Sequence, residues 1–208
     1  MTMVVARTVA IDAAIREAAS PQVVILGAGL DGRAWRMPEL ADAIVFEVDH
    51  PDSQQRKRER AASLQPTARE LRFVSVDFTR DRLDDALAAA GHDPALPTTW
   101  VWEGVVMYLT RADIEATLRA VQARSAAGSH LVVLYTSPSL LRKAAGFALG
   151  LIGEPFRSAF SAERMRTLLS SFGFSVVHDD DLASLAARLT GETSRSLKDI
   201  RLATAILR

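Results

Sequence analysis

The chain has 208 residues, of which 49% are hydrophobic and 24% are charged, a composition that fits one globular domain and not a disordered segment. Its 25 Lys and Arg residues balance its 25 Asp and Glu residues, so no excess of positive charge indicates a nucleic-acid partner. The absence of cysteine excludes disulfides, thiolate catalysis and zinc sites built on sulfur. The four histidines lie too far apart in the sequence to predict a metal site, so none is expected.

The first half of the chain predicts helices and strands that alternate. Residues 4–19 have helical spacing and end at Ser20-Pro21, and the β-branched run QVVIL at 22–26 has the composition of a buried parallel strand. The elements that follow are, in order, a glycine-rich turn at 27–32, a short helix that ends before Pro38, a strand at 44–48, a helix at 51–64, a strand at 71–76, a helix at 80–90 and a strand at 98–102.

The second half continues this alternation. Thr110 with Asp113 three residues later is a variant of the capping box, which predicts a helix from there to Gly128. The remaining elements are, in order, a strand at 130–135, an irregular stretch at 137–158, a helix at 161–171, a strand at 174–178, a helix and loop at 182–199 and a strand at 202–207. The order predicts a single α/β domain over residues 1–208, with a doubly wound, mostly parallel seven-stranded sheet, helices on both faces and a candidate lid at 137–158.

The residues that directly follow the strands are candidates for function, because ligands of open α/β sheets bind at the carboxyl ends of the strands. The first strand is followed by the turn GAGLDG at 27–32, and each of the next three ends in an acid, at Asp49-His50, Asp77-Phe78 and Glu103-Gly104. A single acid at such a place is equally well explained as a helix cap. A glycine turn and three acids in succession predict a ligand-binding crevice.

Each of these residue types has a physical use in binding a nucleoside. Glycines after the first strand let the backbone approach a ligand closely. The Asp49 carboxylate can accept hydrogen bonds from both hydroxyls of a ribose. Asp77 can accept from an exocyclic amine while the Phe78 ring packs on the face of a purine.

The same turn also satisfies the dinucleotide fingerprint G-x-G-x-x-G, with an acid about 20 residues later. An NAD(P)-dependent oxidoreductase is therefore an alternative interpretation. Against it, Pro38 interrupts the helix that would present its N-terminus to a pyrophosphate, and the bulky Trp35 and Arg36 replace the small residues expected there. S-adenosylmethionine carries no phosphate, so these features favour a methyltransferase.

Five stretches of the chain resemble the leucine carboxyl methyltransferase family, including its bacterial branch of S-adenosylmethionine-dependent O-methyltransferases. They are RTVAID at 7–12, QVVILGAGLDGRAWRM at 22–37, FEVDHP at 46–51, WVWEGVVMYL at 100–109 and FRSAFSAERMRTLLSSFGF at 156–174. The resemblance implies a class I methyltransferase fold, which is Rossmann-like. It also implies S-adenosylmethionine as the cofactor and S-adenosylhomocysteine as its product.

The resemblance further implies roles for single residues in holding the cofactor. Arg7 matches the family arginine that pairs with the methionine carboxylate, a task that suits a planar guanidinium. The other implied contacts are the turn Gly27, Ala28 and Gly29 for the methionine part, Asp49 and the adjacent His50 for the ribose, and Asp77 and Phe78 for the adenine.

Two residues after the fourth strand are the candidate catalytic residues. The resemblance implies that Glu103 faces the cofactor's amino group or the transfer site, and that Tyr108 borders the substrate pocket. Transfer to a carboxylate needs no general base, because that nucleophile is ionised at neutral pH. Transfer to a hydroxyl needs one, and Glu103 or His50 is then the candidate.

These matches predict O-methylation of a carboxylate or hydroxyl on a small-molecule acceptor. Neither nucleic acid nor membrane is an expected partner, since the longest apolar run, at 144–152, is far shorter than the ~20 residues that span a bilayer. We expect a cytoplasmic monomer or homodimer. Only six residues precede Arg7, where the family usually has a longer helical region. The pocket is therefore expected to be more open, completed by a second subunit or roofed by 137–158, and a non-catalytic module that binds the cofactor is a further alternative.

Overall fold

A computed structural model describes residues 2–78, 80–138, 156–191 and 197–208. Its centre is a seven-stranded sheet with the strand order β3-β2-β1-β4-β5-β7-β6. The strands, in chain order, are β1 (Gln22–Leu26), β2 (Ile44–Asp49), β3 (Glu70–Ser75), β4 (Thr98–Trp102), β5 (His130–Thr136), β6 (Phe174–Asp181) and β7 (Ile200–Leu207). The predicted α/β fold with seven strands is confirmed.

Strand direction is uniform except at one position. Strands β1 to β5 pair in parallel, whereas β7 is antiparallel to both of its neighbours, β5 and β6. Every residue of β1 and β4 is buried, as expected for central parallel strands covered on both faces. The sheet is thus mostly parallel, as predicted, and the reversed β7 is the feature that composition alone did not indicate.

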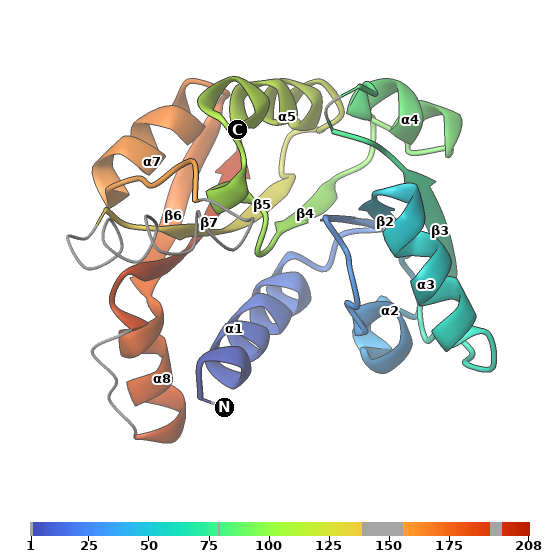
Figure 1. Ribbon diagram of the computed structural model, residues 1–208, viewed down its shortest axis with the longest axis horizontal. Coiled ribbons are helices and arrows are strands. Elements are labelled where there is room, and N and C mark those ends of the chain that lie inside the picture. The colour runs from blue at the N-terminus through green and yellow to red at the C-terminus, as the bar shows by residue number, and fades with distance from the viewer. Residues whose placement is uncertain (1, 79, 139–155, 192–196) are drawn as a thin grey trace.

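Helices cover both faces of the sheet (Figure 1). On one face lie α4 (Leu83–Ala89), α5 (Arg111–Ala123) and α7 (Ala162–Ser170), and on the other α1 (Thr2–Ala18), α2 (Arg33–Arg36) and α8 (Leu182–Thr190). Because successive strand residues point to opposite faces, Val24 of β1 joins the first core and Val23 the second. The helix α3 (Pro51–Ala61) lies beside β3 at the sheet edge.

Local signals explain where several helices begin. The capping box predicted at Thr110 is present, since its side chain accepts from the Asp113 N–H while the Asp113 carboxylate accepts from the Thr110 N–H. Helix α3 begins with His50 as N-cap and Pro51 in its first turn, as expected for a residue that lacks an N–H. Helix α4 begins later than predicted, because the Asp81 N–H donates to the Asp77 carbonyl in a separate turn before it.

Two predicted features fall partly outside the described residues. Of the candidate lid at 137–158, residues 139–155 are not described, and of the helix and loop at 182–199, α8 is present and 192–196 are not described. After the first gap, the Arg157 and Ser158 N–H groups donate to the Met107 carbonyl in η2 (Val106–Tyr108). Among the described helices, none has the length and apolar composition needed to cross a membrane.

The sheet order places a crevice at the carboxyl ends of the central strands. Strand β1 lies between β2 and β4, and the chain leaves it in one direction to build β2 and β3 and in the other to build β4 and β5. At such a switch point the connections leave the carboxyl ends of the two central strands in opposite directions, which opens a space between them. The turn after β1 and the residues after β4 border this space.

Candidate functional site

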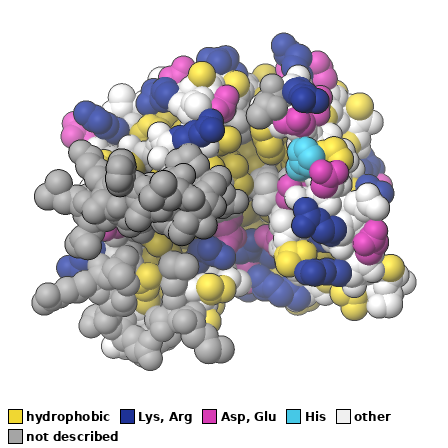
Figure 2. Space-filling model, in the orientation of Figure 1, with side chains coloured by type: hydrophobic (Ala, Val, Ile, Leu, Met, Phe, Trp, Pro, Cys, Tyr) yellow, Lys and Arg dark blue, Asp and Glu magenta, His cyan; other side chains and the backbone are white. Residues whose placement is uncertain are grey.

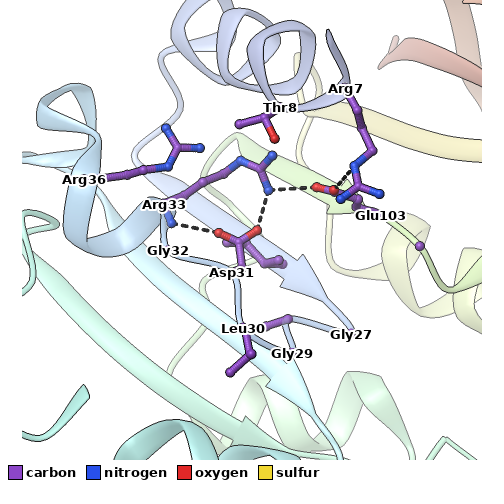
Figure 3. Close-up of a pocket in the computed structure, with 13 residues that line it drawn as sticks. Arg7, Thr8, Gly27, Gly29, Leu30, Asp31, Gly32, Arg33, Arg36 and Glu103 are labelled. Carbon is purple, nitrogen blue, oxygen red and sulfur yellow. Dashed lines mark hydrogen bonds and ion pairs between the residues drawn. The ribbon is translucent and has the colours of Figure 1, made fainter. Parts of the chain in front are cut away.

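A cavity of about 420 Å³ lies at the carboxyl ends of β1 and β4. Its walls come from three places: the first turns of α1, the turn after β1 with the start of α2, and the end of β4. Figure 2 shows this side of the molecule hollowed, with basic and acidic side chains in the hollow. The lining residues labelled in Figure 3 are Arg7, Thr8, Gly27, Gly29, Leu30, Asp31, Gly32, Arg33, Arg36 and Glu103.

The turn after β1 requires glycine at its first position. Gly27 has a φ of +68°, a conformation that other residues adopt only with strain. A Cβ added to Gly27 would lie 2.2 Å from Cγ2 of Val105, in the segment that follows β4. The Gly27 and Ala28 N–H groups both donate to the Val48 carbonyl, at 2.8 and 3.0 Å. The turn is therefore held tightly between the ends of β2 and β4.

Asp49 at the end of β2 is joined to the same turn. One of its carboxylate oxygens accepts from the Gly29 N–H, and the other accepts from the His50 N–H at 2.6 Å. The neighbouring His50 side chain is half exposed, and its Nδ1 accepts from the Asp52 N–H at 3.3 Å as the cap of α3. Asp49 thus lies beside the cavity, whereas His50 has a structural role at the start of a helix.

Arg7 and Glu103 meet inside the cavity, although they lie 96 positions apart in the sequence. Arg7 Nε lies 2.5 Å from Glu103 Oε1, and the two side chains are 25% and 15% exposed. Arg7 Nε is buried, and within the described residues it has no acceptor with hydrogen-bond alignment. The contact is an ion pair that places one positive and one negative group side by side.

Arg33 is the centre of a larger network at the floor of the cavity (Figure 3). Its Nε donates to Asp12 Oδ1 at 2.8 Å, and its Nη1 donates to Glu103 Oε2 at 2.9 Å and to Asp31 Oδ2. Arg36 adds two hydrogen bonds to the Asp12 carboxylate, at 2.6 and 2.9 Å. Three arginines and three acids therefore share this end of the sheet.

The network shifts the pKa of two of its members, Asp12 and Arg33, toward the charged form. Burial alone would raise the pKa of Asp12, but hydrogen bonds from Arg36 and Arg33 outweigh it and hold that pKa below its usual range. Burial would likewise lower the pKa of Arg33, yet the carboxylates of Asp31 and Glu103 raise it above the ordinary value. A buried charge is tolerated only when it is paired, which this network achieves.

Five of the predicted site residues do not line the cavity: Asp49 and His50, described above, and Asp77, Phe78 and Tyr108. The Asp77 side chain follows β3, with Oδ2 3.7 Å from Arg80 Nε, and Phe78 lines a separate cavity of about 390 Å³ between α4 and α5. Tyr108 is 41% exposed and stacks on Phe156 with ring centroids 5.7 Å apart. The structure thus brings together Arg7, the glycine turn and Glu103 with Asp49 next to them, and leaves Asp77, Phe78 and Tyr108 farther along the same edge.

The sequence prediction missed Asp12, Asp31, Arg33 and Arg36 as site residues. A signal was present, since α2 has arginines three positions apart on a short segment that also contributes the fully buried Ala34. Charged residues in such a segment must find buried partners. Which acids serve as partners depends on the tertiary fold. Within the described residues, no group of three or more acids and histidines could hold a metal ion.

Comparison with known proteins gives this cavity a chemical context. The family model of leucine carboxyl methyltransferase matches residues 1–122. An inferred S-adenosyl-L-methionine-dependent methyltransferase of Mycolicibacterium smegmatis is 43% identical over 131 residues, which is 62% of this chain and 43% of that protein. Another of Streptomyces avermitilis is 34% identical over 200 residues, which is 94% of this chain and 65% of that protein. The chain therefore spans less than two thirds of the length of these curated relatives.

A solved structure supports the fold. The magnesium protoporphyrin IX methyltransferase of Synechocystis PCC 6803, determined with bound S-adenosylhomocysteine, matches with a TM-score of 0.60 at 16% identity, over 100% of this chain and 83% of that one. At this identity the match concerns the fold, which is the Rossmann-like fold of class I methyltransferases. Since the family model covers more than half of the sequence, the chain belongs to the leucine carboxyl methyltransferase family.

Proposed function

We propose that this chain binds S-adenosylmethionine in the cavity after β1 and β4 and transfers its methyl group to a small-molecule acceptor. The observation that carries the proposal is the Arg7–Glu103 ion pair beside the glycine turn. The amino-acid end of the cofactor has one carboxylate and one ammonium group. Each is opposite in charge to one member of the pair, the carboxylate to the arginine and the ammonium to the glutamate. Arg7 would pair with the carboxylate and Glu103 with the ammonium.

The remaining contacts follow the order of the strand ends. Val105 packs against Gly27 in the place that a Cβ would take, so the glycine keeps the turn close to the segment after β4, and the turn lines the cavity in which the cofactor would lie. Asp49, joined to Gly29, would hold the ribose hydroxyls, and Asp77 with Phe78 would hold the adenine. The names of the two relatives support S-adenosylmethionine as the cofactor.

The cavity fits a nicotinamide dinucleotide less well. Helix α2 has four residues before Met37 and Pro38, which is too short to present a helix N-terminus to a pyrophosphate. Asp31 and Glu103 line the cavity beside three arginines, and both acids pair with Arg33, so they offset positive charge that would otherwise attract phosphate oxygens. The same acids suit a cofactor that carries a positive sulfonium and an ammonium group.

The acceptor that the site favours is a carboxylate. When bound, the cofactor supplies an electrophilic methyl group, so the chain must mainly hold the acceptor oxygen in line with it. Both Glu103 oxygens are paired with arginines, and His50 caps α3, so neither is free to take a proton from a hydroxyl. A carboxylate needs no such base because it is ionised at neutral pH.

An exposed aromatic pair in and after η2, Tyr108 and Phe156, favours an acceptor with an apolar body. Tyr108 and Phe156 stack with an interplanar angle of 20° and are 41% and 38% exposed, large exposed areas for two aromatic side chains. The Arg157 N–H to Met107 C=O hydrogen bond, at 2.8 Å, holds the two segments together. A flat apolar acceptor could pack on the outer faces of these rings while its carboxylate points toward the cavity.

The experiment that tests the proposal has two parts. Calorimetric titration with S-adenosylhomocysteine and with reduced nicotinamide dinucleotide should give micromolar affinity for the first and none for the second. Methyl-labelled S-adenosylmethionine is then incubated with aromatic carboxylates and with the matching phenols. Transfer to carboxylates supports the proposal, affinity for the dinucleotide alone would overturn it, and binding without transfer to any acceptor would favour a non-catalytic module.

A further inference from the structure

Arg33 has no role in the predicted cofactor site, yet its side chain is the most buried of the three arginines in the cavity. It is 4% exposed, compared with 25% for Arg7 and 44% for Arg36. Arg33 begins α2, and its side chain extends from there across the cavity toward α1 and the end of β4 (Figure 3). A buried arginine in a ligand cavity needs a reason in the structure.

The contacts of Arg33 join three separate elements. Its Nε donates to Asp12 of α1 at 2.8 Å, and its Nη1 donates to Glu103 after β4 at 2.9 Å. The same Nη1 donates to the Asp31 carboxylate, and the Arg33 backbone N–H donates to Asp31 Oδ1 at 2.8 Å. One guanidinium thus fixes α1, the glycine turn and the end of β4 relative to one another.

Glu103 contacts two arginines that differ in how many other acids they bind. Its Oε2 contacts Arg33, which is bound to two further acids and cannot leave without unpairing them. Its Oε1 contacts Arg7, whose only ion pair in the described part of the chain is this one. The Arg7 contact can therefore be exchanged for a ligand, whereas the Arg33 contact stays.

We propose that Arg33 is a positioning residue that holds Glu103 in place while Arg7 exchanges its partner for the carboxylate of the entering cofactor. The inference rests on the proposed function. In the exchange, Arg7 turns from Glu103 Oε1 to the cofactor's carboxylate, and the freed Oε1 accepts the cofactor's ammonium. Glu103 Oε2 remains on Arg33, so the carboxylate keeps its orientation in both states.

The charges of the cavity explain why Glu103 needs this support. Without Arg33, the carboxylates of Asp12, Asp31 and Glu103 would share a partly buried space without the cation that lies between them. Like charges repel one another, so Glu103 would no longer be held in the orientation in which it can accept an ammonium group. The high pKa of Arg33, which Asp31 and Glu103 maintain against burial, means that its own charge is constant.

The test compares two ligands, one with and one without the amino-acid tail whose ammonium group Glu103 would bind. S-adenosylhomocysteine has the amino-acid tail, and 5′-methylthioadenosine has the same nucleoside without it. Arg33→Met should weaken S-adenosylhomocysteine about tenfold or more and 5′-methylthioadenosine less than about threefold, as expected when a charge-assisted contact to the tail is lost. Arg33→Lys keeps the positive charge but lacks the forked guanidinium that reaches several acids. Its affinity for S-adenosylhomocysteine should fall about threefold relative to its affinity for 5′-methylthioadenosine.

Arg16→Met is the matched control, because it removes an arginine of helix α1 that pairs with Glu39 and does not line the cavity. It should leave the ratio of the two affinities within about twofold of the original. Thermal unfolding verifies that each variant folds. If Arg33→Met does not fold, the affinities of Arg33→Lys for the two ligands test the inference. Equal weakening of both ligands, or an unchanged ratio in the folded variants, would overturn the inference. Failure of the unaltered chain to bind S-adenosylhomocysteine would instead overturn the proposed function.

Discussion

At the amino ends of β1 and β4 the polar side chains are mostly neutral and closed off, whereas at the carboxyl ends of the same strands they are charged and line a cavity. At the amino ends, the Gln22 amide exchanges two hydrogen bonds with the backbone of Asp93, each 2.8 Å long. The Thr98 hydroxyl lies 3.0 Å from His92 Nε2 in a hydrogen bond, and the Thr98 N–H donates to the Ser129 hydroxyl at 3.0 Å. These residues join the end of the sheet to the loops beneath it.

The side chains at the carboxyl ends are charged, and some of their contacts can be exchanged for a ligand. Arg7, Arg33 and Glu103 are ionic partners, and Arg7 has no aligned acceptor for its buried Nε within the described residues. Neutral partners that satisfy one another stabilise a closed structure, because breaking them leaves buried groups unpaired. Charged partners at a cavity can be exchanged for a ligand of the same charges. The comparison leads us to expect that one end of the sheet maintains the fold and that the other is the end at which we propose the cofactor binds.

The largest effect is expected for Gly27→Ala at the binding end. The new Cβ would collide with Val105 and the positive φ would be strained, so the turn must move. We expect affinity for S-adenosylhomocysteine to fall about 100-fold or more and stability to fall by about 1–3 kcal/mol. Titration calorimetry and chemical denaturation measure the two quantities.

A second substitution separates the collision from the strain. Val105→Ala removes the Cγ2 atom, so the nearest remaining side-chain atom at position 105 would be its Cβ. In the double variant this atom would lie 3.6 Å from the Cβ added at position 27, an ordinary contact. The double variant should therefore recover part of the lost affinity, and Val105→Ala alone should bind nearly as well as the original chain. If the double variant binds no better than Gly27→Ala, close approach of the two segments is not what the glycine provides.

Glu103→Gln should have the next largest effect, because it removes the charge that both arginines contact. A hydrogen bond to a charged group contributes about 1.5–3 kcal/mol, which corresponds to roughly 10- to 100-fold in affinity. Binding of S-adenosylhomocysteine should fall by that factor. Unchanged affinity in a folded Glu103→Gln protein would place the ammonium elsewhere and would remove the charge argument for this end of the sheet.

At the amino ends of β1 and β4, the stability of the fold should depend on pH through His92, and substitutions there should not change ligand binding. Burial first, and Arg124 second, lower the pKa of His92 to about 4 from 6.5. A lowered histidine pKa gives stability that is fully present above pH 6.5 and is lost as the pH falls toward 4. The free energy of unfolding should therefore decrease by about 2 kcal/mol over this interval through His92.

His92→Gln tests this assignment because glutamine fills part of the space and does not titrate. It should be less stable at about pH 7.5, where the packing of the ring between Phe46 and Trp100 is lost, but its stability should depend less on pH between about 6.5 and 4.5. Denaturant unfolding at several pH values measures both. Equal pH dependence in the two proteins would mean that another group is responsible, and binding of S-adenosylhomocysteine at neutral pH should not change.

The smallest effect is expected at an exposed ion pair that belongs neither to the cavity lining nor to the neutral network, the pair between Arg188 and Asp180. Its side chains are 59% and 37% exposed, so solvent screens the 2.9 Å contact. Arg188→Gln should change the free energy of unfolding by less than about 0.5 kcal/mol and leave binding unchanged. A larger change would show that surface pairs matter as much as the two sheet ends.

The sequence was sufficient for the order of elements and for the part of the site that local motifs encode. Apolar runs such as QVVIL predict buried strands, and the glycine turn and Asp49 come together because adjacent parallel strands end at one edge. Arg33 was not predicted, because its partners Asp12 and Glu103 are 21 and 70 positions away and only the folded sheet brings them together. The direction of β7 was unpredictable for the same reason, since a strand's composition does not record which way its connection returns.

Hydrogen exchange with and without S-adenosylhomocysteine tests the division of the sheet most directly. We predict slower exchange on binding in the turn at 27–33 and in the segment at 103–107, where the cavity lies, and no change at 91–98, where the neutral network lies. The measurement follows both ends of the same strands in one sample. Protection at 91–98, or none at 27–33 under saturating ligand, would contradict the conclusion that the carboxyl ends of β1 and β4 are the binding end.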